Sequence, residues 1–300
     1  MNLISAIITV FGLGLFEIIN SVDNAIINAE VLSTMSKSSR RWFTTWGLFL
    51  SVFLVRGLLP FLIVWILNPG VGFIRTVINV INSGNEIVAS FEKSAPYLLI
   101  LGGILMLFIF FHWLFLEDKN FGLPGERFIA RQGVWFYAVV SAVLSFIVWK
   151  AIKTDPVLAF AAVVGSTVFF ITHGFKAQAE TAEKKFLKKG MTDLAKILYL
   201  EVIDMTFSID GVLGSFAFTF YVPLILLGNG LGALVLRHIT ISNIGRIKKL
   251  VYLKNGAMYS IFFLGTIMTL ESFGIHIPFW FSPLATLTIV SYFFFRNPKG

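Results

Sequence analysis

Long apolar runs recur along nearly the whole chain and restrict it to one class of fold. Apolar residues make up 57% of the 300 residues and charged residues only 13%, which is about half the charged share of a soluble domain. Runs of about 18 or more apolar residues can cross a bilayer as helices. We therefore predict an all-α, polytopic transmembrane helical bundle. About nine spans are expected, at 2–33, 43–67, 96–116, 132–152, 156–174, 195–220, 221–245, 252–270 and 279–295.

The connections and the N-terminus fit the same interpretation. Between the second and third spans, LNPG is followed by the amphipathic segment GFIRTVINVIN, which is too short to span and is expected at the membrane interface. The N-terminal MNLISAIITVFG has no basic segment and no small-residue cleavage site, so we interpret it as a retained span and not as a signal peptide. Because the chain has no Cys, disulfides, thiolate metal sites and Cys nucleophiles are excluded.

The net charge of +8 describes the connections between spans and does not indicate a nucleic-acid partner. With 34–42 on the cytoplasmic side and alternating spans, 18 of the 24 Lys and Arg are cytoplasmic and four are outside. Arg56 and Arg237 fall within spans. By the positive-inside rule the N-terminus lies outside and the C-terminus in the cytoplasm. The basic stretch 175–196 is expected to be a solvated loop.

An internal repeat relates the first and sixth spans. FEIINSVDNA and DMTFSIDG superpose at an offset of 187 residues, which pairs Glu17 with Asp204, Ser21 with Ser208, and Asp23 with Asp210. In the following spans, GLFLSVFLVR and GNGLGALVLR each place a Gly nine residues before an Arg. Five spans separate equivalent elements, so the two copies must have opposite orientations, as in many secondary transporters.

These features predict one membrane domain over 1–300. It consists of a first repeat at 1–116, a connecting helix pair at 132–174, a second, inverted repeat at 195–270, and a last span at 279–295. Gly228 and Gly232 form a G-x-x-x-G pattern, which permits close contact between helices.

Five acidic residues fall within predicted spans. Each costs about 2.5–3.5 kcal/mol at a helix centre, so these side chains must pair, take up protons or bind a cation. Two arginines can neutralise only two of them, and the surplus favours a divalent cation or protons. The five acids are Glu17, Asp23, Glu201, Asp204 and Asp210.

The nearby polar groups are hard oxygen donors, which suit Mg, Ca or Mn better than Zn or Cu. They are the amides of Asn24 and Asn229 and the hydroxyls of Ser21 and Ser208. The four histidines lie near span ends, where packing or interfacial roles are expected; they are His112, His173, His238 and His276.

Helical periodicity leaves two arrangements open for the acids. At about 100° per residue, Asp23 lies off the polar stripe of Glu17, and Asp210 points away from Glu201. Either 21–25 and 208–214 kink or unwind so that the acids converge on one ion, or each off-stripe Asp pairs with an Arg of the next span.

The motifs also resemble a known family. FEIINSVDNAIINAEVLSTM and DMTFSIDGVLGSFAFT, with GLGALVLRHIT and YLKNGAMYSI, resemble the TerC family of integral membrane proteins within the LysE-type transporter superfamily. The similarity is greatest to its bacterial branch of uncharacterised "domain of unknown function" proteins, and it covers about 16–68 and 198–275.

This resemblance implies transport of metal ions, chiefly manganese export, in the cell inner membrane. The implied metal-binding residues are Glu17, Asp23, Asn24, Glu201, Asp204 and Asp210. The supporting polar residues are Ser21, Ser208, Asn229, Arg56 and Arg237.

Our leading hypothesis is a secondary-type transporter that exports or exchanges a divalent cation, Mn²⁺ or Ca²⁺. The lipid bilayer and the metal ion are the expected partners, no tightly bound cofactor is expected, and homo-oligomer formation stays open. One alternative is an accessory protein for envelope stress or membrane-protein assembly. Another is a LysE-like small-solute exporter, in which Arg56 and Arg237 hold a carboxylate. We expect no catalytic residues, because G-x-G-D and H-E-x-x-H motifs are absent.

Overall fold

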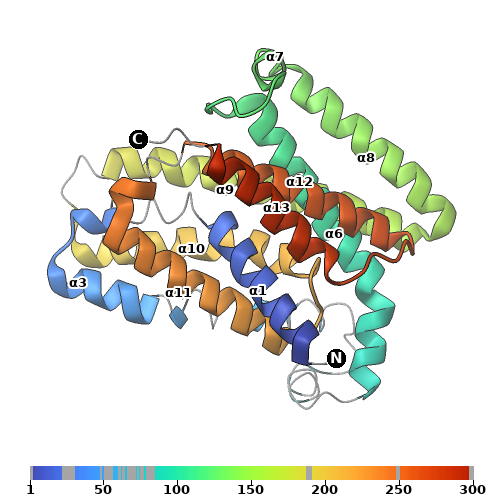
Figure 1. Cartoon of the computed structure of the whole chain (residues 1–300), viewed down its shortest axis with the longest axis horizontal. Coiled ribbons are helices and arrows are strands. Elements are labelled where there is room, and N and C mark those ends of the chain that lie inside the picture. The colour runs from blue at the N-terminus through green and yellow to red at the C-terminus, as the bar shows by residue number, and fades with distance from the viewer. Residues whose placement is uncertain are drawn as a thin grey trace.

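The protein is described by a computed structural model in which the regular elements are helices (Figure 1). The structure describes residues 3–21, 31–47, 49–50, 57–59, 85–186, 191–247 and 251–296, with single positions at 62, 65, 72, 74 and 78. Within these ranges no strand occurs, which confirms the all-α prediction.

The described elements follow one another along the chain as ten α-helices and one π-helix. They are α1 (Leu3–Asn20), α3 (Lys37–Trp42), the π-helix η1 (Phe43–Gly47), α6 (Asn85–Leu116), α7 (Glu126–Ala130), α8 (Trp135–Thr154), α9 (Pro156–Phe186), α10 (Asp193–Ser215), α11 (Val222–Ile247), α12 (Leu253–Ser272) and α13 (Phe281–Phe295).

Four of the described helical segments are long and apolar enough to cross a membrane, which supports the membrane assignment. They are Leu3–Asn20, Ser94–Leu116, Trp135–Thr154 and Pro156–Phe175. Val222–Leu236 and Phe281–Phe295 are shorter apolar helices. The second predicted span, 43–67, lies mostly outside the described residues, and the count of nine spans stays a prediction.

Two helices extend beyond the predicted boundaries. α6 begins at Asn85, eleven residues before the predicted span at 96, and contains Pro96 in its interior. α9 continues to Phe186 through sequence that was expected to be a solvated loop. That extension, AQAETAEKKF, is rich in Ala, Glu and Lys, which are strong helix formers. The length of an apolar run therefore predicts which part of a helix can lie in a bilayer. It does not predict where the helix begins or ends.

α6 forms the centre of the bundle. It packs against α12 and α9, and α12 in turn packs against α13. Side chains from the middle of α6, including Ile104 and Leu105, are completely buried. α8 lies at the edge of the bundle (Figure 1) and packs mainly on α9.

α1 crosses α11 at the predicted G-x-x-x-G pattern. A Cβ at Gly232 would lie 2.8 Å from Cβ of Glu17 and in conflict with the carbonyl oxygen of Gly14. A Cβ at Gly14 would lie 3.4 Å from the carbonyl oxygen of Gly228. The two backbones thus approach more closely than larger residues would allow, and the predicted close contact is confirmed.

This crossing predicts that Gly232→Ala lowers the melting temperature of the purified protein in detergent. The added methyl group must displace Glu17 or the α1 backbone, and overpacking of this kind costs about 1–3 kcal/mol. Gly174→Ala on α9 is the matched control, because its Cβ would meet no atom within 4 Å. An equal effect of both substitutions on the melting temperature would contradict the close crossing.

Candidate functional site

Seven of the eleven predicted site residues have described side chains, and all seven are buried. They are Glu17 on α1, Ser21 just after it, Glu201, Asp204, Ser208 and Asp210 on α10, and Asn229 on α11. The side chains of the other four predicted residues are not described. Asp23, Asn24 and Arg56 lie outside the described residues, and the side chain of Arg237 also lies outside them.

On α1, Glu17 is oriented toward α11. Its side chain is fully buried, and Cβ and Cγ lie against Gly232, where α11 has no side chain. The hydroxyl of Ser21 donates a hydrogen bond to Oε1 of Glu17 at 2.7 Å. A spacing of four residues brings these two groups onto one side of the helix end. Glu17 and Ser21 therefore lie on the same side of α1, as helical periodicity predicts for a polar stripe.

α10 carries four of the predicted residues on one continuous helix. Segment 208–214 does not unwind, because α10 is helical from Asp193 to Ser215. Glu201 and Asp204 are three residues apart and share a face, while Asp210 lies nine residues from Glu201 and points to the opposite side. The first arrangement left open by the sequence required both motifs to kink or unwind, and the second motif does not unwind. The equivalent segment at 21–25 lies almost entirely outside the described residues.

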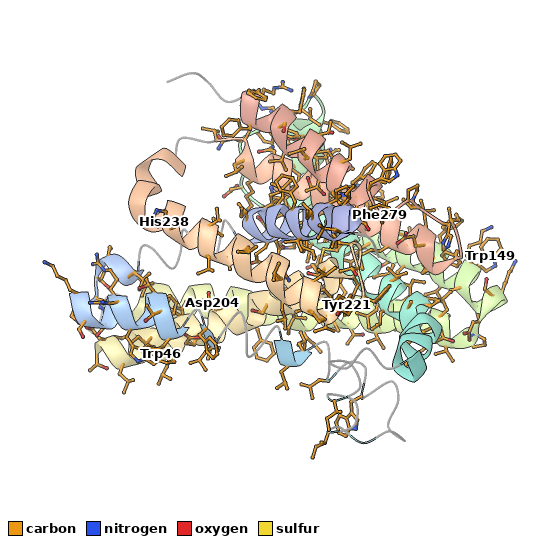
Figure 2. The ribbon with its side chains drawn as sticks, turned by 60° about the horizontal axis from the view of Figure 1, so that its bottom comes forward. Trp46, Trp149, Asp204, Tyr221, His238 and Phe279 are labelled. Carbon is orange, nitrogen blue, oxygen red and sulfur yellow. The ribbon has the colours of Figure 1, made fainter. Side chains whose placement is uncertain are left out.

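Glu201 contacts the start of the second predicted span. A Cβ at Gly47 would overlap Oε1 of Glu201, so the carboxylate lies directly against the backbone of η1. Figure 2 shows Asp204, in the middle of α10, and Trp46 of η1 in the same part of the view. η1 is a π-helical turn, a rare conformation that occurs frequently at functional sites.

The described residues include no group of three Asp, Glu, His or Cys side chains close enough to hold one metal ion. This result does not cover the complete predicted ligand set, since Asp23 and Asn24 are not described. One acid from each motif contacts a glycine of a neighbouring helix. Glu17 contacts Gly232, and Glu201 contacts Gly47. The metal-binding role of the six residues stays a prediction.

Residues 22–297 match a family described as a protein of unknown function, DUF475. The chain belongs to the DUF475 family. The matched region includes every predicted site residue except Glu17 and Ser21. No curated protein and no solved structure matches the chain.

This DUF475 protein also contains a second polar cluster, which was not predicted from the sequence. It lies where α6 ends beside the start of α12. Nζ of Lys254 lies 2.7 Å from Oε2 of Glu117, and Nδ1 of His112 lies 3.3 Å from Oε1 of the same carboxylate. The ring of His112 contacts the ring of His173 on α9, with centroids 3.8 Å apart. No local sequence pattern indicates this cluster, because Glu117 and Lys254 are far apart in the chain.

Both histidines of this cluster pack against aromatic rings. The ring of His112 meets Phe136 edge to face, and the ring of His173 stacks on Phe169 with an interplanar angle of 7°. The packing role expected for these two histidines is therefore confirmed.

The buried carboxylate of Glu126 links the connection between α6 and α7 to α12. Glu126 is 1% exposed and accepts hydrogen bonds from the backbone N–H of Gly122 at 2.7 Å and of Leu123 at 3.1 Å. It also accepts one from the hydroxyl of Tyr259 at 2.8 Å and one from Nδ2 of Asn255 at 3.2 Å. These donors satisfy the buried oxygens of the Glu126 side chain.

The ion pair of Glu117 predicts a pH-dependent contribution to stability. Burial alone would raise the pKa of Glu117, but the hydrogen bond with His112 and the charge of Lys254 lower it from 4.5 to about 2. A lowered pKa stabilises the folded state above the unfolded pKa, and this contribution disappears as the pH falls toward 2. Glu117→Gln should therefore lower the melting temperature in detergent at pH 7, by an amount that shrinks below about pH 4.5.

Asp118→Asn is the control for this measurement, because Asp118 is the exposed neighbour of Glu117. It should leave the melting temperature close to that of the wild type over the same pH range. A Glu117→Gln effect that is constant with pH would contradict the ionised pair.

Proposed function

We propose that this DUF475 protein is a secondary-type membrane transporter that exports or exchanges a divalent metal cation, Mn²⁺ or Ca²⁺. The observation that supports this proposal best is the burial of four carboxylates in two helices of the bundle. They are Glu17 on α1 and Glu201, Asp204 and Asp210 on α10, and none is more than 6% exposed. Ionisable groups buried in membrane helices are rare and commonly mark ion or proton pathways.

Contacts at equivalent positions support an inverted repeat. The offset of 187 residues pairs Gly14 with Glu201, and the Gly-to-Arg motifs pair Gly47 with Gly228. Gly14 contacts Gly228 across α1 and α11, and Glu201 contacts Gly47 across α10 and η1. The helix that carries the acids in one copy therefore contacts the second helix of the other copy: α1 contacts α11, and α10 contacts η1. In both contacts the residues involved occupy equivalent positions of the repeat. An internal two-fold axis would produce this exchange.

The larger helix contacts follow a similar exchange. The third helix of each copy packs on one outer helix, α6 on α9 and α12 on α13. Each of these two pairs also contacts the acid-bearing first helix of the other copy. α10 of the second copy contacts α6 and α9, and α1 of the first copy contacts α12 and α13. This arrangement supports two structurally related halves, with α1 and α10 meeting between them.

The proposed topology has nine spans in the inner membrane, with the N-terminus outside and the C-terminus in the cytoplasm. The distribution of Lys and Arg supports it. We further propose membership of the TerC family, since the acidic motifs resemble that family in residue type, spacing and order.

Charge compensation supplies a mechanism for exchange. A divalent cation bound between α1 and α10 would offset the charge of buried carboxylates, and protons would offset it when the cation leaves. The carboxylates would then carry either the metal ion or protons between the two sides of the membrane. The oxygen-only donor set favours Mn²⁺, Ca²⁺ or Mg²⁺ over softer metals.

The proposal predicts that Asp210→Asn strongly lowers Mn²⁺ flux in proteoliposomes and leaves a folded protein. The substitution keeps the side-chain shape and removes the charge, and we expect a loss of about 10-fold or more. Asp155→Asn, in the connection between α8 and α9, is the matched control and should transport like the wild type. Calcium flux measured on the same vesicles tests the choice of ion.

Unchanged flux of both ions in Asp210→Asn would reject the proposal. If the buried acids only hold helices together, as in an accessory protein, a different result is expected. The substitution would then lower the melting temperature, and calorimetry on the purified wild type would detect no binding of Mn²⁺ or Ca²⁺.

A further inference from the structure

A buried polar stripe continues along α10 beyond the acidic residues. Glu201, Asp204, Ser208 and Ser215 are spaced by three, four and seven residues, so they share one face of the helix. All four are buried. Gly211 occupies the remaining position on this face and adds no side chain. The stripe spans about 21 Å at 1.5 Å per residue, a large part of the thickness of a bilayer core.

The two halves of the stripe differ in charge. The half near Glu201 and Asp204 is acidic, and the half near Ser208 and Ser215 is neutral. Each serine donates its hydroxyl hydrogen to its own helix, Ser208 to the carbonyl of Asp204 at 2.6 Å and Ser215 to the carbonyl of Gly211 at 2.7 Å. The neutral half therefore presents oxygen acceptors to the neighbouring helix.

Asn229 of α11 meets the neutral end of the stripe in a fixed orientation. Because the Ser215 hydroxyl donates to Gly211, it accepts from Nδ2 of Asn229, at 2.9 Å. Oδ1 of the amide consequently points away from Ser215. Asn229 is 1% exposed, and within the described part of the chain its Oδ1 has no hydrogen-bond partner. A buried carbonyl oxygen of this kind is rare and calls for a ligand, such as a cation or a water molecule.

The position of Asn229 connects this end of the stripe with the acid of α1. Asn229 precedes Gly232 by three residues on α11, which is about one helical turn, and the side chain of Glu17 packs against Gly232. A neutral oxygen therefore lies one turn from a buried carboxylate, on the side of the bundle that the proposed topology assigns to the outer half of the membrane.

We infer that Asn229 Oδ1 is a neutral outer binding position for the divalent cation, separate from the acidic residues, and that Ser215 positions its amide. This inference rests on the proposed transport function. A cation must bind strongly enough to enter a pathway and weakly enough to leave it. A neutral amide beside carboxylates provides the weaker position, where the ion exchanges water for protein oxygen on its way to or from Glu17 and the acids of α10.

The test compares Mn²⁺ flux in proteoliposomes with equilibrium Mn²⁺ binding measured by calorimetry. Asn229→Leu removes the oxygen and should lower the maximal flux about 10-fold or more, while binding to the acidic residues changes much less. Asn229→Asp keeps the shape and adds a charge, so it should bind Mn²⁺ more tightly and release it more slowly. Ser215→Ala removes the positioning contact and should give an intermediate flux.

Thr286→Val on α13 is the matched control. Thr286 is also 1% exposed, and its Oγ1 has no hydrogen-bond partner among the described residues, yet it lies on neither α10 nor α11. It should transport Mn²⁺ like the wild type. Melting temperatures of all variants identify loss of folding, and the isosteric Asn229→Asp decides the case if Asn229→Leu does not fold.

The possible failures are distinguishable. Wild-type flux in Asn229→Leu, or wild-type flux and affinity in Asn229→Asp, overturns the neutral position and leaves the transport proposal intact. Loss of Mn²⁺ binding in Asn229→Leu as complete as in Asp210→Asn also overturns it, because Asn229 would then belong to the acidic site. A wild-type protein that neither binds nor transports Mn²⁺ or Ca²⁺ overturns both.

Discussion

A buried carboxylate is among the least favourable groups that an apolar helical bundle can contain, and the arrangement of α1 and α10 depends on keeping four of them inside the bundle. An apolar side chain at any of these positions would be buried at a lower cost in free energy than a carboxylate. Glu17 and Glu201 lie against the backbone of other helices, at Gly232 and Gly47, and not against lipid. The glycines matter because they leave space for a carboxylate-bearing side chain between two closely packed helices.

The second polar cluster shows a different solution to the same problem. There Glu117 has Lys254 and His112 as direct partners, and Glu126 accepts hydrogen bonds from four neighbouring groups. These contacts stabilise the connections at the end of α6. Glu201 and Asp204 of α10 share their helix face with two serines, Ser208 and Ser215, and that face ends at the amide of Asn229. We propose ion binding for the acids of α1 and α10 because they lie in the two repeated acidic motifs. We assign Glu117 and Glu126 a structural role because their contacts join the end of α6 and the following connection to α12.

The sequence predicted the parts of the fold that depend on bilayer thickness. Ser94–Leu116 and Pro156–Phe175 agree with the predicted spans within two residues, because apolar length alone determines such segments. It did not predict the extension of α9 to Phe186, since helix formers continue a helix into water as readily as in lipid. Burial of the site acids followed from their position inside apolar runs. The contact between Glu201 and Gly47 joins residues distant in sequence through a π-helical turn, and no local pattern encodes it.

Anomalous X-ray scattering from crystals grown with Mn²⁺ is the most direct test of the central claim, that the buried acidic motifs bind a divalent cation. Our account predicts an anomalous peak between α1, α10 and α11, close to carboxylate oxygens, and its loss in crystals of Asp210→Asn. A structure in which these helices show no peak, or in which Mn²⁺ binds only beside Glu117 and His112, would contradict it.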